Sequence, residues 1–388
     1  MNSLKLDGAL KILRMLNEDG FEAYIVGGYV RDRILGIEGK DIDITTSATV
    51  DEIERVFPFT YNKSTKFQTV CVWMNGVDYE VTTFRTDLKY FDHRHPKTKV
   101  SSSLGNDVKR RDFTINALCL DKELTVIDLI DGRLDLENKI IKAVGSPIKR
   151  FGEDALRMFR AFRFSARYDF EIEKHTYLAI KRVHALTRFV SKERIREELS
   201  KTLNEKYFSN VLPKMIDAGI YKAYPKLDKA FKVLNNNYNY VDFVTLMALS
   251  SYLAGKINDE LILTKKEIKV IKEILKYVDL LRSRSLALDN LLDVDKASLK
   301  NAFTILKILK DETYDFDQIL SLYEDMPIKS VKDLRINGGD IKKTLKLQDS
   351  PKIKTYLNLC LRAVLYGRCE NNRTDLIDYL NSGINYEA

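Results

Sequence analysis

The sequence is poor in residues that cross-link a chain or interrupt its helices. Its 388 residues include only seven prolines, which is consistent with long helices, and no internal repeat or low-complexity segment is evident. There are four cysteines, and no two of them have the Cys-x-x-Cys spacing of a zinc or redox site. We therefore expect reduced, buried or incidental thiols in a cytoplasmic protein at Cys71, Cys119, Cys360 and Cys369.

Long apolar segments are also absent. No segment approaches the run of about 18 apolar residues that indicates a membrane helix, so we expect no membrane span. Residues 1–20 mix acids and lysines in an amphipathic pattern and lack the apolar region and cleavage site of a signal peptide. Hydrophobic residues make up 45% of the chain and charged residues 31%, which is typical of a globular protein with roughly two to four domains at this length.

The charge balance is positive. The chain has 64 Lys and Arg against 56 Asp and Glu, a net charge of +8, and its pI is near 9.0. This favours an anionic partner such as nucleic acid, although a lysine-rich surface without such a partner is the alternative. One lysine-rich segment, 265–276, carries isoleucines at helical spacing, which predicts a solvated helix face opposite a buried stripe.

The pattern of apolar residues changes near residue 146. Before it, helical and strand patterns alternate, and β-rich runs at 69–74 and 77–84 flank Asn75-Gly76, a strong signal for a type I′ hairpin. After it, helical periodicity dominates, with expected helices at 154–167, 175–190, 192–203, 241–253, 265–281 and 297–310. The expected fold class is α+β and mostly helical, with a mixed sheet in the N-terminal part.

The segment 86–108 is polar, basic and poorly periodic, so we expect a mobile loop. It contains His93 and His95, but no third ligand is spaced nearby, so a metal site there is disfavoured.

The most informative segment, 24–44, reads YIVGGYVRDRILGIEGKDIDI. A short apolar strand ends at Gly27-Gly28, a glycine pair that lets the backbone approach a phosphate closely. A helical segment carrying Arg31 follows. A plain tight turn is the alternative when the glycines are considered alone.

Asp41 and Asp43 close that segment in a second β-like run. Because side chains alternate along a strand, both carboxylates are expected on one face, where they repel each other. A hard divalent cation such as Mg²⁺, with substrate phosphate in its coordination shell, relieves that repulsion. A solvated Asp-x-Asp pair is the alternative, but the closeness of the glycines, arginine and aspartates favours metal-dependent nucleotidyl transfer.

Two further segments concentrate arginine. Arg110, Arg111 and Asp112 precede an apolar strand, and arginine forks match phosphate oxygens, whereas aspartate can accept from a ribose hydroxyl. On a helix at about 100° per residue, four more arginines fall within an arc of about 120°, namely Arg157, Arg160, Arg163 and Arg167. Such a face destabilises an isolated helix unless an anion compensates it, and the alternative is a set of salt bridges to other helices.

These motifs resemble a known family. The order Gly-Gly, Arg-Asp, Leu-Gly, Asp-x-Asp is similar to the signature of the DNA polymerase β-like nucleotidyltransferases, and more narrowly of the class II tRNA nucleotidyltransferases and bacterial poly(A) polymerases. Residues 109–117 closely resemble the family's RRDFTxNA motif, and residues 153–157 its EDxxR motif. Weaker resemblances are EVTTFR at 80–85, ERIxxEL at 193–199 and DLxINGxDL at 333–340, whereas the Gly-Pro-x-Ile-Gly turn that usually follows is replaced by SPKIK.

The resemblance implies template-independent addition of CCA to the 3′ end of tRNA from CTP and ATP, with release of pyrophosphate. Asp41 and Asp43 would bind two Mg²⁺ ions, one activating the RNA 3′-hydroxyl and one stabilising pyrophosphate. Glu80 is the candidate third catalytic carboxylate, with an exposed strand acid as the alternative. The implied nucleotide-binding residues are Gly27, Gly28, Arg31, Arg110, Arg111, Asp112, Glu153, Asp154, Arg157, Arg160 and Arg163.

Within that set the resemblance implies separate roles. Asp154 and Arg157 would form Watson–Crick-like hydrogen bonds with the incoming base, and Asp112 would favour ribonucleotides. Arginine can donate to O2 and N3 of cytosine or to N1 of adenine, and aspartate can accept from the exocyclic amine. Guanine and uracil present the wrong pattern.

The resemblance also implies a division of the chain. A polymerase β-like nucleotidyltransferase head is expected at 1–145, followed by an all-helical neck at 146–205 for base recognition, a body at 206–285 and a tail at 286–388. The expected partner is the tRNA acceptor arm with its 3′ end, with no stable protein partner.

Four alternatives remain. They are a poly(A) polymerase, a partial CC-adding or A-adding enzyme, an RNA-binding relative without catalysis, and a small-molecule nucleotidyltransferase. The segment 86–108 resembles the flexible loop of full CCA-adding enzymes and argues against CC-only addition. The absence of a long basic C-terminal extension argues against poly(A) synthesis, the intact Asp41 and Asp43 argue against a loss of catalysis, and the large basic helical half argues against a small-molecule substrate.

Overall fold

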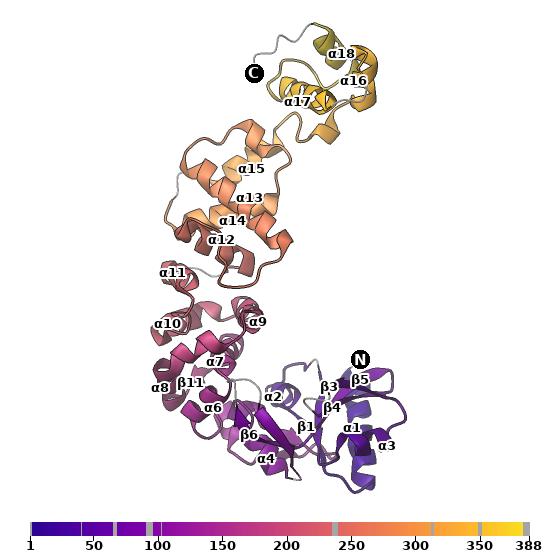
Figure 1. The fold of residues 1–388 in the computed structure, drawn as a ribbon, viewed down its shortest axis with the longest axis vertical. Helices are drawn as coiled ribbons and strands as arrows, with labels where there is room; N and C mark the ends of the chain where they lie inside the picture. Colours follow the sequence, from indigo (N-terminus) through magenta and orange to yellow (C-terminus); the bar gives the residue numbers. More distant parts are fainter. Residues whose placement is uncertain are drawn as a thin grey trace. The chain divides into compact units, whose positions relative to one another are not determined.

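The computed structural model describes residues 2–39, 41–64, 68–90, 96–101, 103–234, 240–311, 314–347 and 351–382. The chain separates into two compact units (Figure 1). The first comprises Met1–Phe243 and Asn258–Ile262, and the second Val244–Ile257 and Leu263–Ala388. The expected fold class, mostly helical α+β with an N-terminal mixed sheet, is confirmed. Among the described residues, no helix is both long and apolar enough to cross a membrane.

The first unit contains a seven-stranded sheet with the order β3-β4-β5-β2-β1-β8-β9. The bounds of these strands are β1 Ala23–Val26, β2 Asp43–Thr46, β3 Thr60–Ser64, β4 Thr69–Met74, β5 Val77–Thr83, β8 Cys119–Leu120 and β9 Val126–Ile127. Only the β2–β5 pair in this sheet is parallel, so the sheet is mixed, as predicted. Asn75 and Gly76 both have positive φ, 53° and 80°, as a type I′ hairpin requires.

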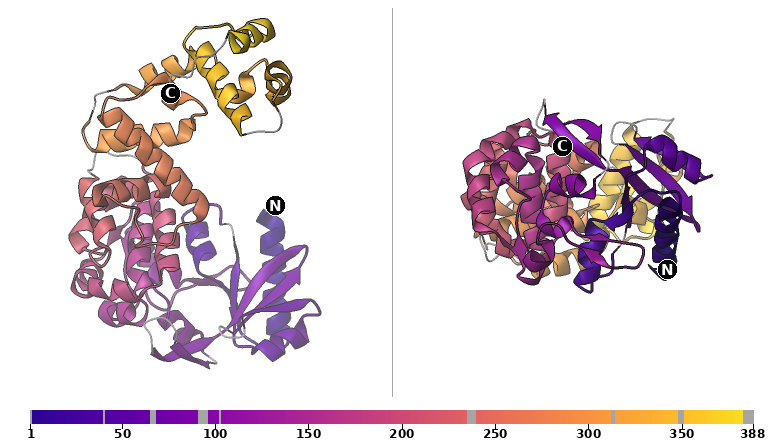
Figure 2. Two further views of the ribbon diagram at one scale, coloured as in Figure 1. Left: turned by 45° about the horizontal axis from the view of Figure 1, so that its top comes forward. Right: turned by 90° about the horizontal axis from the view of Figure 1, so that it is seen from below.

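The two faces of this sheet differ in burial. Helices α1 (Asn2–Glu18) and α3 (Val50–Val56) pack on one face, which Figure 2 shows for α1 beside the strands. The Tyr79 hydroxyl on that face donates to the Lys5 carbonyl of α1 at 2.8 Å, and Val70, Val72 and Val81 are fully buried. Because strand side chains alternate, the intervening residues point to the other face, where the candidate carboxylates lie.

The prediction of a mobile loop at 86–108 is wrong for most of that segment. Strands β6 (Arg85–Tyr90) and β7 (Pro96–Val100) form an antiparallel hairpin, and helix α4 (Leu104–Lys109) follows. These strands have mostly polar sequences, so hydrophobic periodicity gave no signal for a pairing that depends on main-chain hydrogen bonds. His93 and His95 lie outside the described residues.

Helix α7 (Leu156–Tyr168) packs against α9 (Lys192–Leu203) and α10 (Phe208–Ala218). Its apolar side is buried, including Met158, Phe159, Phe162 and Ala166. The other helices are η2 Thr114–Asn116, α5 Gly132–Glu137, α6 Pro147–Glu153, α8 Lys174–Val183, η3 His184–Phe189 and α11 Pro225–Val233. Two short strands, β10 Ile140–Ile141 and β11 Glu171–Ile172, form a separate two-stranded sheet. Helix α2 (Gly28–Ile34) follows β1 directly.

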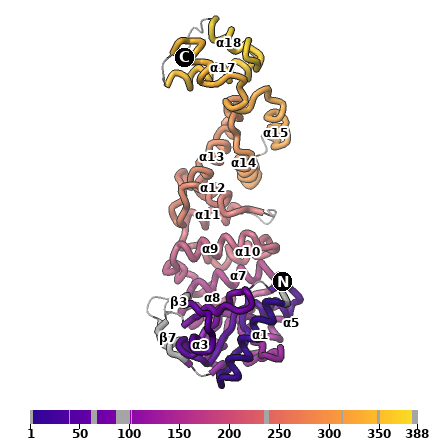
Figure 3. Tube along the Cα trace, turned by 90° about the vertical axis from the view of Figure 1, so that its right-hand side faces the viewer, coloured from indigo at the N-terminus to yellow at the C-terminus, as the bar shows by residue number. Residues whose placement is uncertain are grey.

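The second unit contains helices and no strand among its described residues. Helices α13 and α14 run side by side (Figure 3). The lysines of α13 are exposed whereas Ile271 and Ile274 are buried, which confirms the predicted solvated face. The helices are α12 Phe243–Ala254, α13 Lys265–Arg282, α14 Lys296–Ile308, α15 Phe316–Glu324, α16 Gly338–Leu345, α17 Lys352–Leu365 and α18 Arg373–Asn381, with 3₁₀ turns η4 Leu288–Leu291 and η5 Val331–Asp333. The four-part division at 145, 205 and 285 stays a prediction.

Candidate active site

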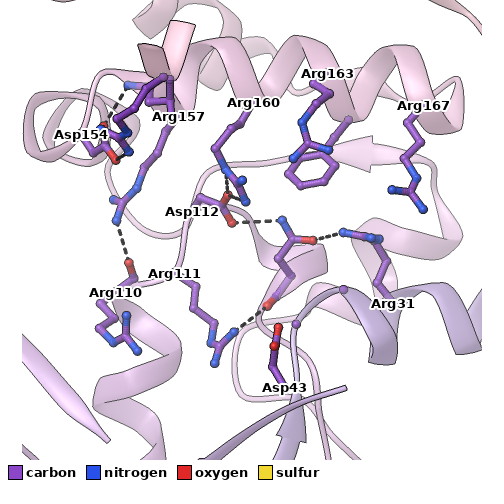
Figure 4. Close-up of a pocket in the computed structure, with 16 residues that line it drawn as sticks. Arg31, Asp43, Arg110, Arg111, Asp112, Asp154, Arg157, Arg160, Arg163 and Arg167 are labelled. Atoms are coloured by element: carbon purple, nitrogen blue, oxygen red, sulfur yellow. Dashed lines mark hydrogen bonds and ion pairs between the residues drawn. The ribbon is translucent and has the colours of Figure 1, made fainter. Parts of the chain in front are cut away.

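A cavity of about 510 Å³ in the first unit brings the predicted motifs together (Figure 4). Its described lining includes eight arginines and three aspartates, so it suits an anionic ligand. The lining residues are Gly27, Gly28, Arg31, Asp43, Arg110, Arg111, Asp112, Asn116, Asp154, Leu156, Arg157, Arg160, Arg163, Phe164, Arg167 and Arg194. Three predicted site residues, Asp41, Glu80 and Glu153, are not among them.

The turn between β1 and α2 requires glycine. Gly27 has φ 77° and ψ −134°, a conformation essentially confined to glycine. A Cβ at this position would lie 3.6 Å from Nη1 of Arg111 and 3.8 Å from Oδ2 of Asp43. The main chain here therefore runs close to both a guanidinium and a carboxylate that line the cavity.

Arg31 is buried and held by several partners at once. Its Nε and Nη2 donate to Oδ1 of Asp32 at 2.9 and 2.8 Å, and its Nη1 donates to the side-chain oxygen of Asn116. Its guanidinium carbon lies 5.1 Å from the ring centre of Phe164 and 4.7 Å from that of Tyr168. The orientation of Arg31 is thus fixed by the protein.

Asn116 connects two of the predicted motifs, the segment 24–44 and the segment 109–117. Besides accepting from Arg31, it donates through Nδ2 to Oδ1 of Asp112 at 3.0 Å, and its carbonyl accepts from Nη1 of Arg111 at 3.4 Å. The sequence analysis placed Asn116 inside a motif without giving it a role. Its amide chemistry is the only signal, since an amide can accept from a cation and donate to an anion at the same time.

Asp112 is ionised and surrounded by donors. Burial by itself would raise its pKa, but the charge of Arg160, the Asn116 amide and the charge of Arg157 together hold the pKa well below its usual range. Both Nε and Nη2 of Arg160 lie 2.7 Å from Oδ2, and the Phe113 amide donates to Oδ1 at 2.8 Å. Asp112 therefore acts as a hydrogen-bond acceptor.

The two adjacent arginines are anchored by a carboxylate that the sequence analysis missed. Asp107 is buried and pairs with Arg110 at 2.6 Å and Arg111 at 3.0 Å. Burial opposes ionisation of Asp107, but the two guanidinium groups lower its pKa. The spacing i, i+3 and i+4 at the end of α4 was the available signal. The Nε of Arg111 is buried and has no hydrogen-bond partner among the described residues.

The arginines of α7 lie along one side of the helix (Figure 4). Arg163 donates to Glu198 at 2.6 Å, Arg160 lies 3.7 Å from the same carboxylate, and Arg167 lies 3.3 Å from Asp32. The salt-bridge alternative is confirmed for these arginines, because each has a carboxylate partner. Each also lines the cavity, and binding of an anion there stays a prediction. Glu198 of α9 was missed by the sequence analysis, although it belongs to the segment that resembles ERIxxEL.

Arg157 and Glu153 form an ion pair at the edge of the cavity. Nη1 of Arg157 donates to Glu153 at 3.1 Å and to the Arg150 carbonyl at 3.3 Å, and Nη2 donates to the Arg110 carbonyl at 3.0 Å. Arg150 also donates to Glu153, at 2.7 Å. Glu153 thus supports two arginines from outside the cavity lining, whereas Arg157 is part of the lining.

Asp154 lies beside Arg157 at the start of α7. It accepts the Leu156 amide at 3.0 Å, and it accepts two hydrogen bonds from Arg194 of α9, at 3.1 and 2.7 Å. A forked arginine contact fixes both the position and the plane of a carboxylate. Arg194 was not predicted as a site residue.

The predicted catalytic carboxylates lie at the sheet. Asp43 is the first residue of β2 and is the register neighbour of Glu80 on β5, and both are exposed. Asp41 precedes the strand and is also exposed, with Ile42 buried between the two aspartates, as alternation requires. No described group of three or more His, Cys, Asp or Glu side chains forms a metal cage. Oxygen ligands from one or two carboxylates plus substrate phosphate are a usual Mg²⁺ environment, so these residues fit that ion.

Three family models together match most of the chain. They are described as "Poly A polymerase head domain" over residues 23–142, "Probable RNA and SrmB- binding site of polymerase A" over residues 169–231, and "tRNA nucleotidyltransferase domain 2 putative" over residues 232–380.

Known proteins are similar to this chain over nearly their full length. A CCA-adding enzyme of Ligilactobacillus salivarius is 36% identical over 95% of each chain. The structure of the Bacillus stearothermophilus CCA-adding enzyme in complex with CTP has a TM-score of 0.81 and 30% identity, covering 97% of each chain. A Thermotoga maritima CCA-adding enzyme complexed with tRNA has a TM-score of 0.71 at 22% identity over 98% of each chain, which shows a shared fold.

Proposed function

We propose a mechanism of nucleotide addition for this chain on the premise that it belongs to the family of CCA-adding enzymes, which are tRNA nucleotidyltransferases. The substrates are CTP, ATP and a tRNA that lacks its 3′-terminal CCA. The observation that carries the proposal is the single cavity lined by the glycine turn, Asp43, the paired arginines and the Asp154–Arg157 pair. Family membership does not assign roles to individual residues, so the residue roles are part of the proposal.

The incoming base would be read by Asp154 and Arg157. Arg194 fixes the carboxylate of Asp154 in an accepting orientation, so it can receive a hydrogen bond from the exocyclic amine of cytosine or adenine. Arg157 would donate to the acceptor next to that amine, after exchanging a hydrogen bond to a backbone carbonyl for one to the base. Guanine and uracil present a carbonyl where Asp154 needs a donor, so they are rejected.

The sugar and triphosphate would lie between the base-reading pair and the sheet. Asp112, whose pKa is held below its usual range, would accept a hydrogen bond from a ribose hydroxyl. Arg111 would contribute a buried Nε–H that has no partner among the described residues, and Gly27 would allow the phosphates to approach the main chain beside Arg111. The excess of arginine in the lining balances the charge of the triphosphate.

The transfer step would take place at the sheet. Asp41 and Asp43 would hold Mg²⁺, with Glu80 next to Asp43 adding negative charge at the same face. When bound, the metal supplies activation of the RNA 3′-hydroxyl and stabilisation of the departing pyrophosphate. A bond forms between O3′ and the α-phosphorus, the bond from that phosphorus to pyrophosphate breaks, and the hydroxyl proton passes to water.

The finer assignment of parts follows the same proposal. Head 1–145 would carry the transfer chemistry, neck 146–205 the base recognition, and body 206–285 with tail 286–388 the acceptor arm of tRNA. The cytoplasm, where tRNA and nucleotides meet, is the proposed compartment.

Sequencing the products made on a tRNA that lacks its terminus tests the proposal. With CTP and ATP together, addition of C, C and A with release of pyrophosphate is expected. Long adenosine tracts would instead indicate a poly(A) polymerase, addition of one or two nucleotides a partial enzyme, and no product with either nucleotide an RNA-binding relative. Asp43→Asn in the same assay controls for contaminating activity.

A further inference from the structure

One edge of the sheet carries exposed aromatic side chains that the proposed mechanism does not use. Phe59, Tyr61 and Trp73 are 64%, 50% and 50% exposed, and we call them the aromatic surface. Phe59 and Trp73 are in edge-to-face contact, with ring centres 6.0 Å apart, and the Trp73 amide donates to the Phe59 carbonyl at 3.1 Å. Strand β3 is the last strand of the sheet on this side.

The strand register places the aromatic surface on the same face as the catalytic carboxylates. Cys71 of β4 pairs with Tyr61 of β3 and with Glu80 of β5, and Glu80 pairs with Asp43 of β2. Paired residues point to one face, so these four residues form a row across the sheet. Three strand spacings of about 4.8 Å separate Tyr61 from Asp43, which is about 14 Å.

A second row of cross-strand neighbours also places an aromatic residue beside a carboxylate. Trp73 pairs with Asp78 of β5, and Phe59 continues that row through its main-chain contact with Trp73. Val70 and Val72 alternate with Cys71 and Trp73 along β4, so they point to the opposite face, where they are fully buried beneath helices α1 and α3. The aromatic surface is therefore outside the apolar core, and core packing does not explain why it is aromatic.

We propose that the aromatic surface stacks on bases of the single-stranded 3′ end of the RNA substrate. The inference deepens the proposed function and depends on it. Aromatic side chains stack on any base because every base has a π-face, so such a surface tolerates different terminal sequences. The distance to Asp43 is about that of four stacked bases at about 3.4 Å each. Bases just before the reacting hydroxyl can thus reach the surface along the same face.

The charges around the surface favour bases over phosphates as the contacting groups. Asp78 and Glu80 lie in the same two rows, and carboxylates repel a phosphate backbone. Stacking leaves the phosphates pointing away from the sheet. A protein partner fits less well, because the three rings together expose only on the order of 300 Å², below the roughly 800 Å² per partner of a stable interface.

Trp73 is the only tryptophan in the chain, so its fluorescence reports on this surface alone. We expect saturable quenching when a tRNA with a single-stranded 3′ end is added to the full-length protein. The same tRNA trimmed to its last base pair should quench much less. Phe59→Leu, which keeps Trp73, should weaken the affinity for the first tRNA several-fold.

Steady-state nucleotide addition gives the second readout. Trp73→Leu should raise the KM for tRNA about tenfold, while the KM for CTP and kcat at saturating tRNA stay unchanged. Leu4→Ala, an exposed apolar position on α1 at the opposite face of the sheet, is the matched control and should change neither. Thermal unfolding of each variant confirms that the fold is retained.

The outcomes separate this inference from the proposed function. If the wild type adds CCA and Trp73→Leu leaves the KM for tRNA unchanged, the aromatic surface does not bind RNA and the proposed function stands. A wild type that self-associates in light scattering, and a Trp73→Leu variant that does not, would show a protein interface instead and overturn the inference. If the wild type adds no nucleotide at all, the proposed function itself fails.

Discussion

Arg194 and Asp154 form a forked ion pair, with nitrogen–oxygen distances of 3.1 and 2.7 Å, that joins α9 to the segment between α6 and α7. The pair lies at the cavity, and the side-chain plane of Asp154 depends on it. A residue from the ERIxxEL-like segment therefore positions a residue of the EDxxR-like segment.

Replacement of Arg194 should weaken base selection more than overall binding. Arg194→Lys keeps the charge but loses the fork, so Asp154 can rotate and its preference for an amine weakens. We expect kcat/KM for CTP to fall about tenfold and the discrimination against UTP to fall with it. Competition assays with all four nucleotides measure this, and Lys201→Ala, an exposed position on the same helix, is the control. Unchanged discrimination in Arg194→Lys would contradict the positioning role.

Arg157→Ala should blur the choice of nucleotide. The side chain donates to two backbone carbonyls and to Glu153, and Glu153 keeps Arg150 as a partner in the variant, so the variant should fold. Because a base would lose its donor on one side, misincorporation of GTP or UTP should become measurable, as sequencing of the products would detect. A variant that adds CCA with wild-type accuracy would exclude Arg157 from base recognition.

Asp43→Asn should abolish turnover without lowering stability. The carboxylate is exposed at the start of β2, so its replacement should move the unfolding temperature by no more than about 2 °C, whereas kcat should fall at least about a thousandfold. Single-turnover assays with and without added Mg²⁺ measure the loss of turnover, and calorimetry measures the unfolding temperature. Asp51→Asn, an exposed aspartate of α3, should leave both values unchanged. Retained turnover in Asp43→Asn would refute the metal assignment.

Asp112→Asn should change how stability depends on pH. The folded pKa of Asp112 lies below its unfolded value of about 3.9, so its ionisation stabilises the protein above that pH and the contribution is lost as the pH falls below it. At pH 7 the variant should be less stable by about 1–3 kcal/mol, because Arg160 loses a charged partner. The difference should shrink below about pH 4. Denaturant midpoints of both proteins between pH 7 and 3 measure it, and a constant difference would show that the Asp112 charge is not the cause.

Local patterns were sufficient for most of the elements. The bounds of β4 and α9 agree with the prediction because an uninterrupted β-rich run beside Asn-Gly and a clear helical period each identify an element within a few residues. The hairpin of β6 and β7 was missed because a polar strand pair has no periodic burial to reveal it. The start of α7 was placed early because Asp154 accepts the Leu156 amide just before the helix begins instead of entering the helix.

The sequence by itself determined the family, the mostly helical α+β class, and the segments that carry the site chemistry, because these depend on residue type and short-range spacing. Only the tertiary structure decided which side chains meet. Asn116 joins Arg31 to Asp112, and Arg194 orients Asp154, each between segments that lie far apart in the sequence, so local periodicity does not encode these contacts. Electrostatic pairing of buried groups depends on distance in space, and the fold sets that distance.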